Sequence, residues 1–341
     1  MEKITFNPIL ITRKLLNPLD DRTRAILIER FGLNNSEPRT LESIGREYGI
    51  TRERVRQIES FALGKIRKSG EFEGIDEVFK EIVSLVNGFG GIVREDDFLT
   101  SVAKKSDHQK HVSFLLTVGS DFNKEKEDKD FYHTWSTDLD RAKKVKSVLK
   151  NIHKEFTDTT LFFEREILDM VASCLKEILP NSAEDRIVFS ILKISKMLNA
   201  NDLGEWGLSS SPYISPRGMR DYAFLVMRRH GSPMHFSEAA SAIQDIFNKR
   251  AHVQTVHNEL IKDKRFILVG RGLYALKEWG YEGGIVRNVI EKILSDNGAL
   301  SKDEIVKRVL KERYVKENTI LVNLQNKSFF QKDSQGNYTL L

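Results

Sequence analysis

Residues Thr51 to Glu59 read T-R-E-R-V-R-Q-I-E, and this stretch decides how the N-terminal part of the chain folds. Thr51 suits an N-cap, because its hydroxyl can accept a hydrogen bond from a free backbone N–H of the first helical turn. We therefore expect a helix from Arg52 to Lys68. Its predicted buried face consists of apolar residues at steps of three and four: Val55, Ile58, Ala62 and Ile66.

The opposite face of this helix carries long side chains with hydrogen-bonding tips: Arg52, Glu53, Arg56 and Gln57. In a DNA major groove, arginine complements guanine, glutamine complements adenine and glutamate complements cytosine. The pattern therefore predicts a base-reading surface. The alternative is a charged face that is only solvated, as on many short helix pairs that bind nothing.

The residues just upstream predict a helix-turn-helix. Thr40 to Tyr48 indicates a short helix, and Gly49 allows the chain to turn sharply into the next one. Residues 39–68 contain eight basic and four acidic residues, in a chain whose net charge is +5. This basic excess favours a partner that carries phosphates.

Several spaced motifs follow one another here: R-F-G-L at 30–33, P-R-T-L-E at 38–42, I-G at 44–45 and the stretch at 51–59. Together they are similar to sigma-70 region 4, over roughly Leu15 to Lys68. The resemblance implies that the second helix enters the major groove of the minus thirty-five promoter hexamer. It also implies that the preceding helix touches the flap of RNA polymerase.

Carried over by position, the resemblance makes Glu53, Arg56 and Gln57 base readers and Arg52 a mixed base and phosphate contact. The implied phosphate contacts are Thr40, Arg46, Arg54, Lys65 and Arg67, and the candidate polymerase contacts are Leu27 and Phe31. Two positions depart from the family pattern. Ser43 stands where an acidic residue is common, and Gly64 replaces a usual basic residue at a cost of roughly 1 kcal/mol of helix stability.

A complete sigma factor places promoter-melting and linker regions before this domain, whereas only some fifteen residues precede it here. We therefore expect a partial or regulatory promoter role. Composition predicts several small soluble domains, since the chain has 341 residues, 40% hydrophobic and 30% charged. No apolar run could span a membrane, so a cytoplasmic protein is expected. Cys174 is the only cysteine, which excludes intrachain disulfides, and we expect it to be buried.

Four aromatic tails recur after residue 70, at 131–135, 203–208, 273–279 and 337–341. The tryptophans in the first three lie 71 and 73 residues apart, a period that suits three helices plus a β-hairpin. We predict a mainly α fold, in which a helix-turn-helix at 1–70 precedes a string of winged helices. Their predicted ranges are 74–136, 137–216, 217–281 and 283–341, with linkers at 69–74 and 209–216.

The third of these segments gives the clearest pattern. Helices are predicted at 219–229 and 253–262, with Ser237 capping a helix between them, and a hairpin at 266–276. Phe236, Val253, Val256 and Leu260 are expected to face the core. The stretches 233–236, 253–260 and 270–281 resemble the HARE-HTH domain, which implies association with DNA or polymerase rather than chemistry.

Residues 217–281 contain eleven basic and six acidic residues. The candidate base-facing set on the predicted third helix is Gln254, Thr255, His257 and Asn258. Candidate phosphate contacts are Lys262, Lys264, Arg265 and Arg271. The alternative is that this face binds a protein, as winged helices often do.

Signals for catalysis are weak. Glu127-Asp128-Lys129, with Asp121 upstream, fits a fragment of a nuclease site, but such triplets arise by chance in a chain this charged. His108 and His111 lack a third metal ligand, so we expect solvated or helix-capping roles for them.

We therefore predict a non-enzymatic protein without cofactor, metal or small-molecule substrate, whose partners are double-stranded DNA and the RNA polymerase core. One alternative is a polymerase-binding module that never reads DNA. Another is the targeting subunit of a restriction or defence system, which would need an enzyme supplied in trans.

Overall fold

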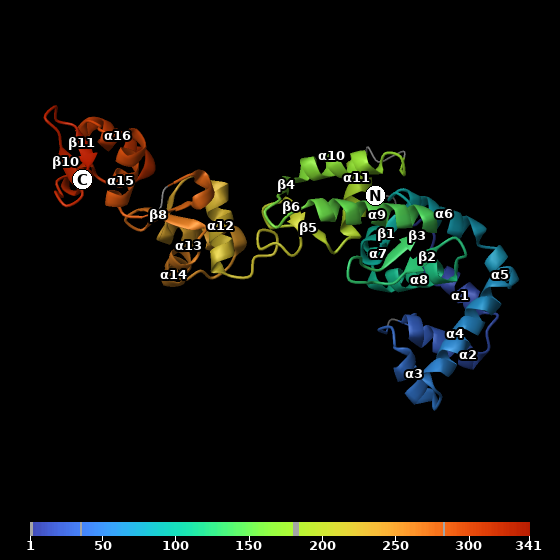
Figure 1. Cartoon of the computed structure of the whole chain (residues 1–341). Coiled ribbons are helices and arrows are strands. Elements are labelled where there is room, and N and C mark those ends of the chain that lie inside the picture. Colours follow the sequence, from blue (N-terminus) through green and yellow to red (C-terminus); the bar gives the residue numbers. More distant parts are fainter. Residues whose placement is uncertain (1–2, 35, 180–183, 282–283) are drawn as a thin grey trace. The chain divides into compact units, whose positions relative to one another are not determined.

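The computed structural model describes residues 3–34, 36–179, 184–281 and 284–341 (Figure 1). It is mainly helical with small sheets, which confirms the predicted fold class at that level. The chain divides into two compact units, Met1–Ser210 and Ser211–Leu341. This division falls inside the linker predicted at 209–216.

The first unit opens with four helices: α1 (Pro8–Leu16), α2 (Asp21–Phe31), α3 (Leu41–Tyr48) and α4 (Arg52–Arg67). The Thr51 hydroxyl accepts from the N–H of Arg54 at 3.1 Å, so the predicted cap and start of α4 are confirmed. Gly49 ends α3 with φ at +64°, which glycine adopts without strain. Close packing at the turn also explains Gly45, because a Cβ there would lie 2.7 Å from the Ile50 carbonyl oxygen.

A mixed segment follows the helix-turn-helix. Its elements are α5 (Gly70–Glu73), α6 (Asp76–Asn87), β1 (Ile92–Arg94), α7 (Glu95–Val102), α8 (Ser106–Val118), β2 (Asn123–Glu125) and β3 (Thr134–Ser136). The strands form an antiparallel sheet in the order β1-β3-β2. The linker predicted at 69–74 is wrong in part, because α5 occupies most of it.

The next segment repeats this order of elements. It contains α9 (Leu139–Glu155), β4 (Phe162–Phe163), α10 (Glu164–Leu175), α11 (Asp185–Lys193), β5 (Leu198–Ala200) and β6 (Glu205–Leu208). Its strand order is β4-β6-β5, which places the last strand in the middle as in the preceding sheet.

The second unit contains two further segments of the same plan. The first has α12 (Met219–His230), β7 (Met234–His235), α13 (Phe236–Phe247), α14 (Val253–Lys262), β8 (Phe266–Gly270), β9 (Leu273–Leu276) and the short helix η1 (Lys277–Trp279). The last has α15 (Val286–Asn297), α16 (Lys302–Glu312), α17 (Glu317–Leu324), β10 (Phe330–Lys332) and β11 (Tyr338–Leu340). There a single bridge between Leu300 and Tyr338 replaces the first strand.

Three details of the second unit correct the sequence prediction. His235, not Ser237, caps α13, because its ring nitrogen Nδ1 accepts from the N–H of Ser237 while the Glu238 carboxylate accepts from the N–H of His235. Phe236 is only half-buried. Val253 is 44% exposed, although Val256 and Leu260 face the core as predicted.

The cores of the first unit cross the predicted domain boundaries. One core joins the helix-turn-helix to the segment that follows, with Leu27, Ile66 and Phe114 among its fully buried members. A second core joins Ile92 and Phe131 to the helices α9 to α11. The predicted segments 1–70 and 74–136 therefore pack together as one body with the part of segment 137–216 that ends at Ser210.

Two single residues differ from expectation. Cys174 is exposed rather than buried. His111 is 2% exposed rather than solvated, since it lies on the inner side of α8. None of the helices in the described parts of the chain is long and apolar enough to cross a membrane.

Candidate nucleic-acid interface

Helix α4 presents the predicted base-reading side chains on its outer face. Val55, Ala62 and Ile66 are fully buried, so the apolar stripe fixes which face turns outward. The first two turns leave Arg54 and the whole predicted set exposed: Arg52, Glu53, Arg56 and Gln57. The amphipathic pattern thus places two guanidinium groups, a carboxylate and an amide on one open surface.

Three of these side chains have paired tips: Glu53 and Arg56 pair with each other, and Gln57 pairs with Arg54. Nη2 of Arg56 lies 2.7 Å from Oε1 of Glu53, and this hydrogen bond holds the pKa of Glu53 below its ordinary value. Arg54 donates to Oε1 of Gln57 at 3.2 Å. All four side chains are solvent-exposed. Exposed ion pairs such as Arg56–Glu53 contribute little to stability, and Gln57 is neutral, so the groups can exchange these partners for base or phosphate atoms.

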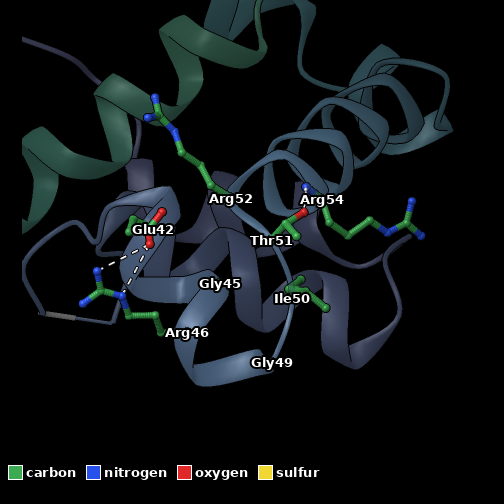
Figure 2. Close-up of a pocket in the computed structure, with 8 residues that line it drawn as sticks. All are labelled: Glu42, Gly45, Arg46, Gly49, Ile50, Thr51, Arg52 and Arg54. Carbon is green, nitrogen blue, oxygen red and sulfur yellow. Dashed lines mark hydrogen bonds and ion pairs between the residues drawn. The ribbon is translucent and has the colours of Figure 1, made fainter.

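A hollow of about 750 Å³ lies where α3 turns into α4, lined by Glu42, Gly45, Arg46, Gly49, Ile50, Thr51, Arg52 and Arg54. Figure 2 shows the side chains of Arg46, Arg52 and Arg54 extending outward in different directions from this turn. Arg46 also contacts the Glu42 carboxylate at 3.4 Å, with 80% of its side chain exposed. The positive end of the α4 dipole adds to this cationic rim, an arrangement that suits phosphate.

The threonines near this rim act first as helix caps. The hydroxyl of Thr40 accepts from the N–H of Ser43 at 3.1 Å, as Thr51 does for Arg54. Each hydroxyl retains its own proton as a donor, so Thr40 keeps the capacity for its predicted phosphate contact.

A second hollow, of about 550 Å³, lies on the α2 side of α4 and adds a residue that the sequence prediction missed. It is lined by Arg22, Thr23, Ile50, Arg54, Gln57, Ile58 and Phe61. Arg22 lies about thirty residues upstream of Arg54 and meets it only because α2 packs against α4. Because Arg22 lies on a neighbouring helix, the sequence around α4 gives no indication that it belongs to this surface.

The two predicted phosphate contacts at the C-terminal end of α4, Lys65 and Arg67, differ in their hydrogen-bond partners. Lys65 is exposed. Arg67 instead donates from Nε to the Val118 carbonyl and from Nη2 to the Thr117 carbonyl, both at 2.8 Å. This guanidinium ties α4 to the end of α8 and stays exposed, so its predicted phosphate contact remains a prediction.

The candidate polymerase surface is largely covered. Leu27 is fully buried in the core shared by α2, α4 and α8. Phe31 is half-buried, and its ring packs edge-on against that of Phe114 with the centroids 5.1 Å apart. Leu27 is thus not available to a partner, which corrects that prediction, because α8 of the same chain occupies this face.

The second candidate surface lies on α14. Gln254, Thr255 and Asn258 are exposed, and the amide of Gln254 donates to Oδ1 of Asn258 at 3.1 Å. His257 is half-buried and stacks on Phe236 with ring centroids 4.1 Å apart. Three of the four predicted base-facing residues are therefore open to solvent, whereas His257 joins α14 to the start of α13.

Among the predicted phosphate contacts of this surface, Lys262, Lys264 and Arg271 are exposed. Arg265 is not a free cation, because its Nη2 lies 2.8 Å from Asp221 and 2.7 Å from Asp263. Burial raises the pKa of Asp263 and the hydrogen bond from Arg265 lowers it, with a net shift below the ordinary value. The prediction for Arg265 is corrected, since the residue forms a structural ion pair inside this segment.

Two further cations border α14 and were missed by the sequence prediction. Lys249 and Arg250 are exposed just before the helix begins. They lie three and four residues before the start of the predicted helix, so a basic dipeptide on its N-terminal side was the available signal.

The weak catalytic signals gain no support from the geometry. Glu127 pairs with Lys196, and the Asp128 carboxylate accepts from the backbone N–H groups of Asp130 and Phe131. Across the described ranges, no group of three or more His, Cys, Asp or Glu side chains is placed to hold a metal ion.

Comparison with known families gives one finding: residues 15–68 are similar to sigma-70, region 4. No curated protein was found to match the chain. The matched range contains α2, α3 and α4, and hence the helix-turn-helix, its arginine rim and the outer face of α4. The similarity to this DNA-binding region supports a DNA-binding role in transcription.

Proposed function

We propose that this chain reads a promoter-like DNA element through α4 and thereby regulates transcription initiation. The observation that carries the proposal is the outer face of α4, where Arg52, Glu53, Arg56 and Gln57 are all exposed beside an arginine-lined turn. In a helix-turn-helix, this is the face that enters the major groove. The similarity of residues 15–68 to sigma-70 region 4 supports the same role.

The structure favours DNA reading over a purely polymerase-binding role. The face around Leu27 is closed by α8, whereas the outer face of α4 is open. The family similarity still supports RNA polymerase as a general partner, and we propose that any such contact uses a surface other than Leu27.

We further propose that the four segments after the helix-turn-helix are winged helices and that the third is of HARE type. The recurring order of helices and strands, with the last strand central in three of the sheets, supports this assignment. In this proposal, α14 and its flanking cations Lys262, Lys264 and Arg271 supply a second DNA contact. The chain then acts by binding rather than by catalysis.

The test is selection from a randomised duplex library, followed by sequencing of what the protein retains. We compare the unchanged protein, a Glu53→Ala, Arg56→Ala variant and a Glu77→Ala, Lys80→Ala control. The control removes a similar exposed pair, with 2.9 Å between the charged atoms, from α6 of the same unit. We expect one enriched hexamer with the unchanged protein and the control, and its loss in the α4 variant.

The single change Arg56→Ala refines the same test. A bidentate base contact discriminates by roughly 1–3 kcal/mol, so the preference for the selected site over random DNA should fall about 5- to 150-fold. Equal losses on both kinds of DNA would remove Arg56 from the base readers. The absence of any enriched sequence with the unchanged protein would refute sequence-specific reading altogether.

A further inference from the structure

The last segment of the chain repeats the core spacing and the hairpin register of the α14 segment. Glu317, which begins α17, lies 64 residues after Val253, which begins α14. The same interval relates the core positions of the two segments: Val256 and Ile320, Leu260 and Leu324, and Phe266 and Phe330. No insertion separates the two copies from the start of the helix to the end of the hairpin.

Equivalent residues of the two hairpins are separated by the same interval along the chain. Phe266 pairs with Leu276 across one hairpin, and Phe330 pairs with Leu340 across the other. The turns also agree, because Gly272 and Gly336 both take positive φ, at +71° and +90°. The fold therefore places the outer face of α17 where α14 has its own outer face.

This outer face of α17 is open and shares two polar positions with that of α14. Asn318 and Thr319 stand where α14 has Gln254 and Thr255, and all four are exposed. Val322, in the middle of the face, is 61% exposed. Amide and hydroxyl tips suit base edges, and an exposed aliphatic group suits the thymine methyl.

Lysines surround this face. Lys316 immediately precedes α17, Lys327 follows its end and Lys332 lies on β10, and all three are exposed. Within the described ranges, none of these three forms an ion pair with a carboxylate. Lysines at both ends of an exposed helix and on its hairpin, none of which forms an ion pair with any residue that the structure describes, suit contacts with a phosphate backbone.

The corresponding helices of the first unit are covered. On α8, Phe114, Leu115 and Leu116 are fully buried, and α8 packs against α1. On α11, Ile191 and Leu192 are fully buried, and α11 packs against β1. The third helix of each repeat is thus used for internal packing in the first unit and left open in the second.

A tight junction joins the two segments of the second unit. Arg313 is 3% exposed and donates to the backbone carbonyl groups of Leu268 and Gly284. The N–H of Tyr314 donates to the Val269 carbonyl at 2.9 Å, so the chain that leads into α17 lies along the edge of β8. This junction fixes α17 next to the hairpin that follows α14.

We propose that α17, with Lys316, Lys327 and Lys332, is a further binding site for double-stranded DNA that acts beside α14. The proposal rests on the proposed function only in taking duplex DNA as the partner. In this proposal the fourth segment binds the backbone and groove of DNA rather than a protein. The reason is that the charges around α17 are positive, as contacts with phosphates require.

The experiment measures binding of the full chain to a random-sequence duplex at a series of salt concentrations. Each phosphate contact contributes about 0.9 to the slope of log K against log salt, so Lys316→Gln, Lys327→Gln, Lys332→Gln should lower the slope by roughly two to three. The matched control is Lys143→Gln, Lys144→Gln, Lys154→Gln on α9, which removes the same charge elsewhere and should change the slope by less than one contact. Val322→Glu should weaken binding about tenfold at low salt, because a carboxylate in the middle of this face is repelled by the negative charge of the DNA.

Random-sequence DNA keeps this test separate from reading by α4. If no hexamer is selected but the slope falls only in the α17 variant, the proposed function fails and the α17 site stands. If the slopes of log K against log salt are equal for the α17 variant and the α9 control, then α17 is not a DNA-binding site. Its exposed face would then be a surface for a protein partner.

Discussion

Arg265 and Arg271 of the second unit carry the same charge, but they have different surroundings and different expected roles. Arg265 joins Asp221 and Asp263, whose side chains are only 5% and 14% exposed, whereas Arg271 lies exposed at the hairpin turn. Removing one partner of a buried ion pair costs roughly 3–5 kcal/mol, because the remaining charge stays buried. Arg265→Ala should therefore destabilise the second unit by about that amount.

Arg271→Ala is the matched comparison for this prediction. It should leave the free energy of unfolding nearly unchanged and lower the slope of log K against log salt by about 0.9. Denaturant unfolding and DNA titration of both variants check the two expectations. An Arg265→Ala protein that unfolds like the unchanged one would contradict the structural role of Arg265.

The same ion pair predicts a dependence of stability on pH. The folded-state pKa of Asp263 lies below its ordinary value, so the ionised carboxylate is favoured in the folded protein. Its contribution to stability is fully present above the unfolded-state pKa, and it is lost as the pH falls through the folded-state pKa. Asp263→Asn should therefore make the acid loss of stability of the second unit shallower, as measured by unfolding between neutral and acidic pH.

For single residues, the sequence predicts the roles that depend on near neighbours in the chain. Thr51 and Gly49 act through neighbours three or four residues away, so their roles as cap and turn followed from local pattern alone. Arg67 finds its carbonyl partners about 50 residues away along the chain, and Asp221, one of the two carboxylates that hold Arg265, lies 44 residues away from it. Local sequence shows that a residue is basic, but only tertiary packing shows whether a carbonyl or a carboxylate already holds it.

At the scale of single elements, α4 contains a glycine that the fold does not require. A Cβ at Gly64 would meet no atom within 4 Å, and its φ is not in the positive range. Alanine in a helix interior is about 1 kcal/mol more favourable than glycine. Gly64→Ala should therefore raise the unfolding free energy of the first unit by up to that amount.

Gly49→Ala is the control, and its expected effect on the unfolding free energy has the opposite sign. A Cβ at Gly49 also meets nothing within 4 Å, but its φ of +64° is unfavourable for alanine. Denaturant midpoints should move up for the change at residue 64 and down for the change at residue 49. A downward shift for both would mean that Gly64 has a packing role that its surroundings do not reveal.

The elements themselves were largely predictable, whereas their partners were not. The bounds of α4 and α14 match expectation to within one residue, because caps and apolar periodicity are local. The burial of Leu27 beneath α8 depends on which helix packs where, and the hydrophobic pattern of α2 predicts only that some partner exists. For the same reason, the segment boundaries at 70 and 136 did not reveal that the cores continue across them.

At the scale of the whole molecule, each of the two units contains buried cores of its own. A mutation inside one core should therefore act on that unit alone, because distant sites without shared partners are additive. Phe114 is fully buried in the first unit, and large-to-small changes of this kind cost about 3–5 kcal/mol. Arg265→Ala is the corresponding change in the second unit.

We predict that the full chain unfolds thermally in two separable transitions. Phe114→Ala should lower only one transition and Arg265→Ala only the other, by roughly 2–4 °C per kcal/mol for units of this size. Phe163→Ala, at a side chain 66% exposed in the first unit, should move neither. Calorimetry of the three variants checks the assignment, and a shift of both transitions by either core change would show that the units fold as one cooperative body. Separate transitions would mean that α4 and the α14–α17 pair are held by independently stable frameworks, so that loss of one DNA contact leaves the other intact.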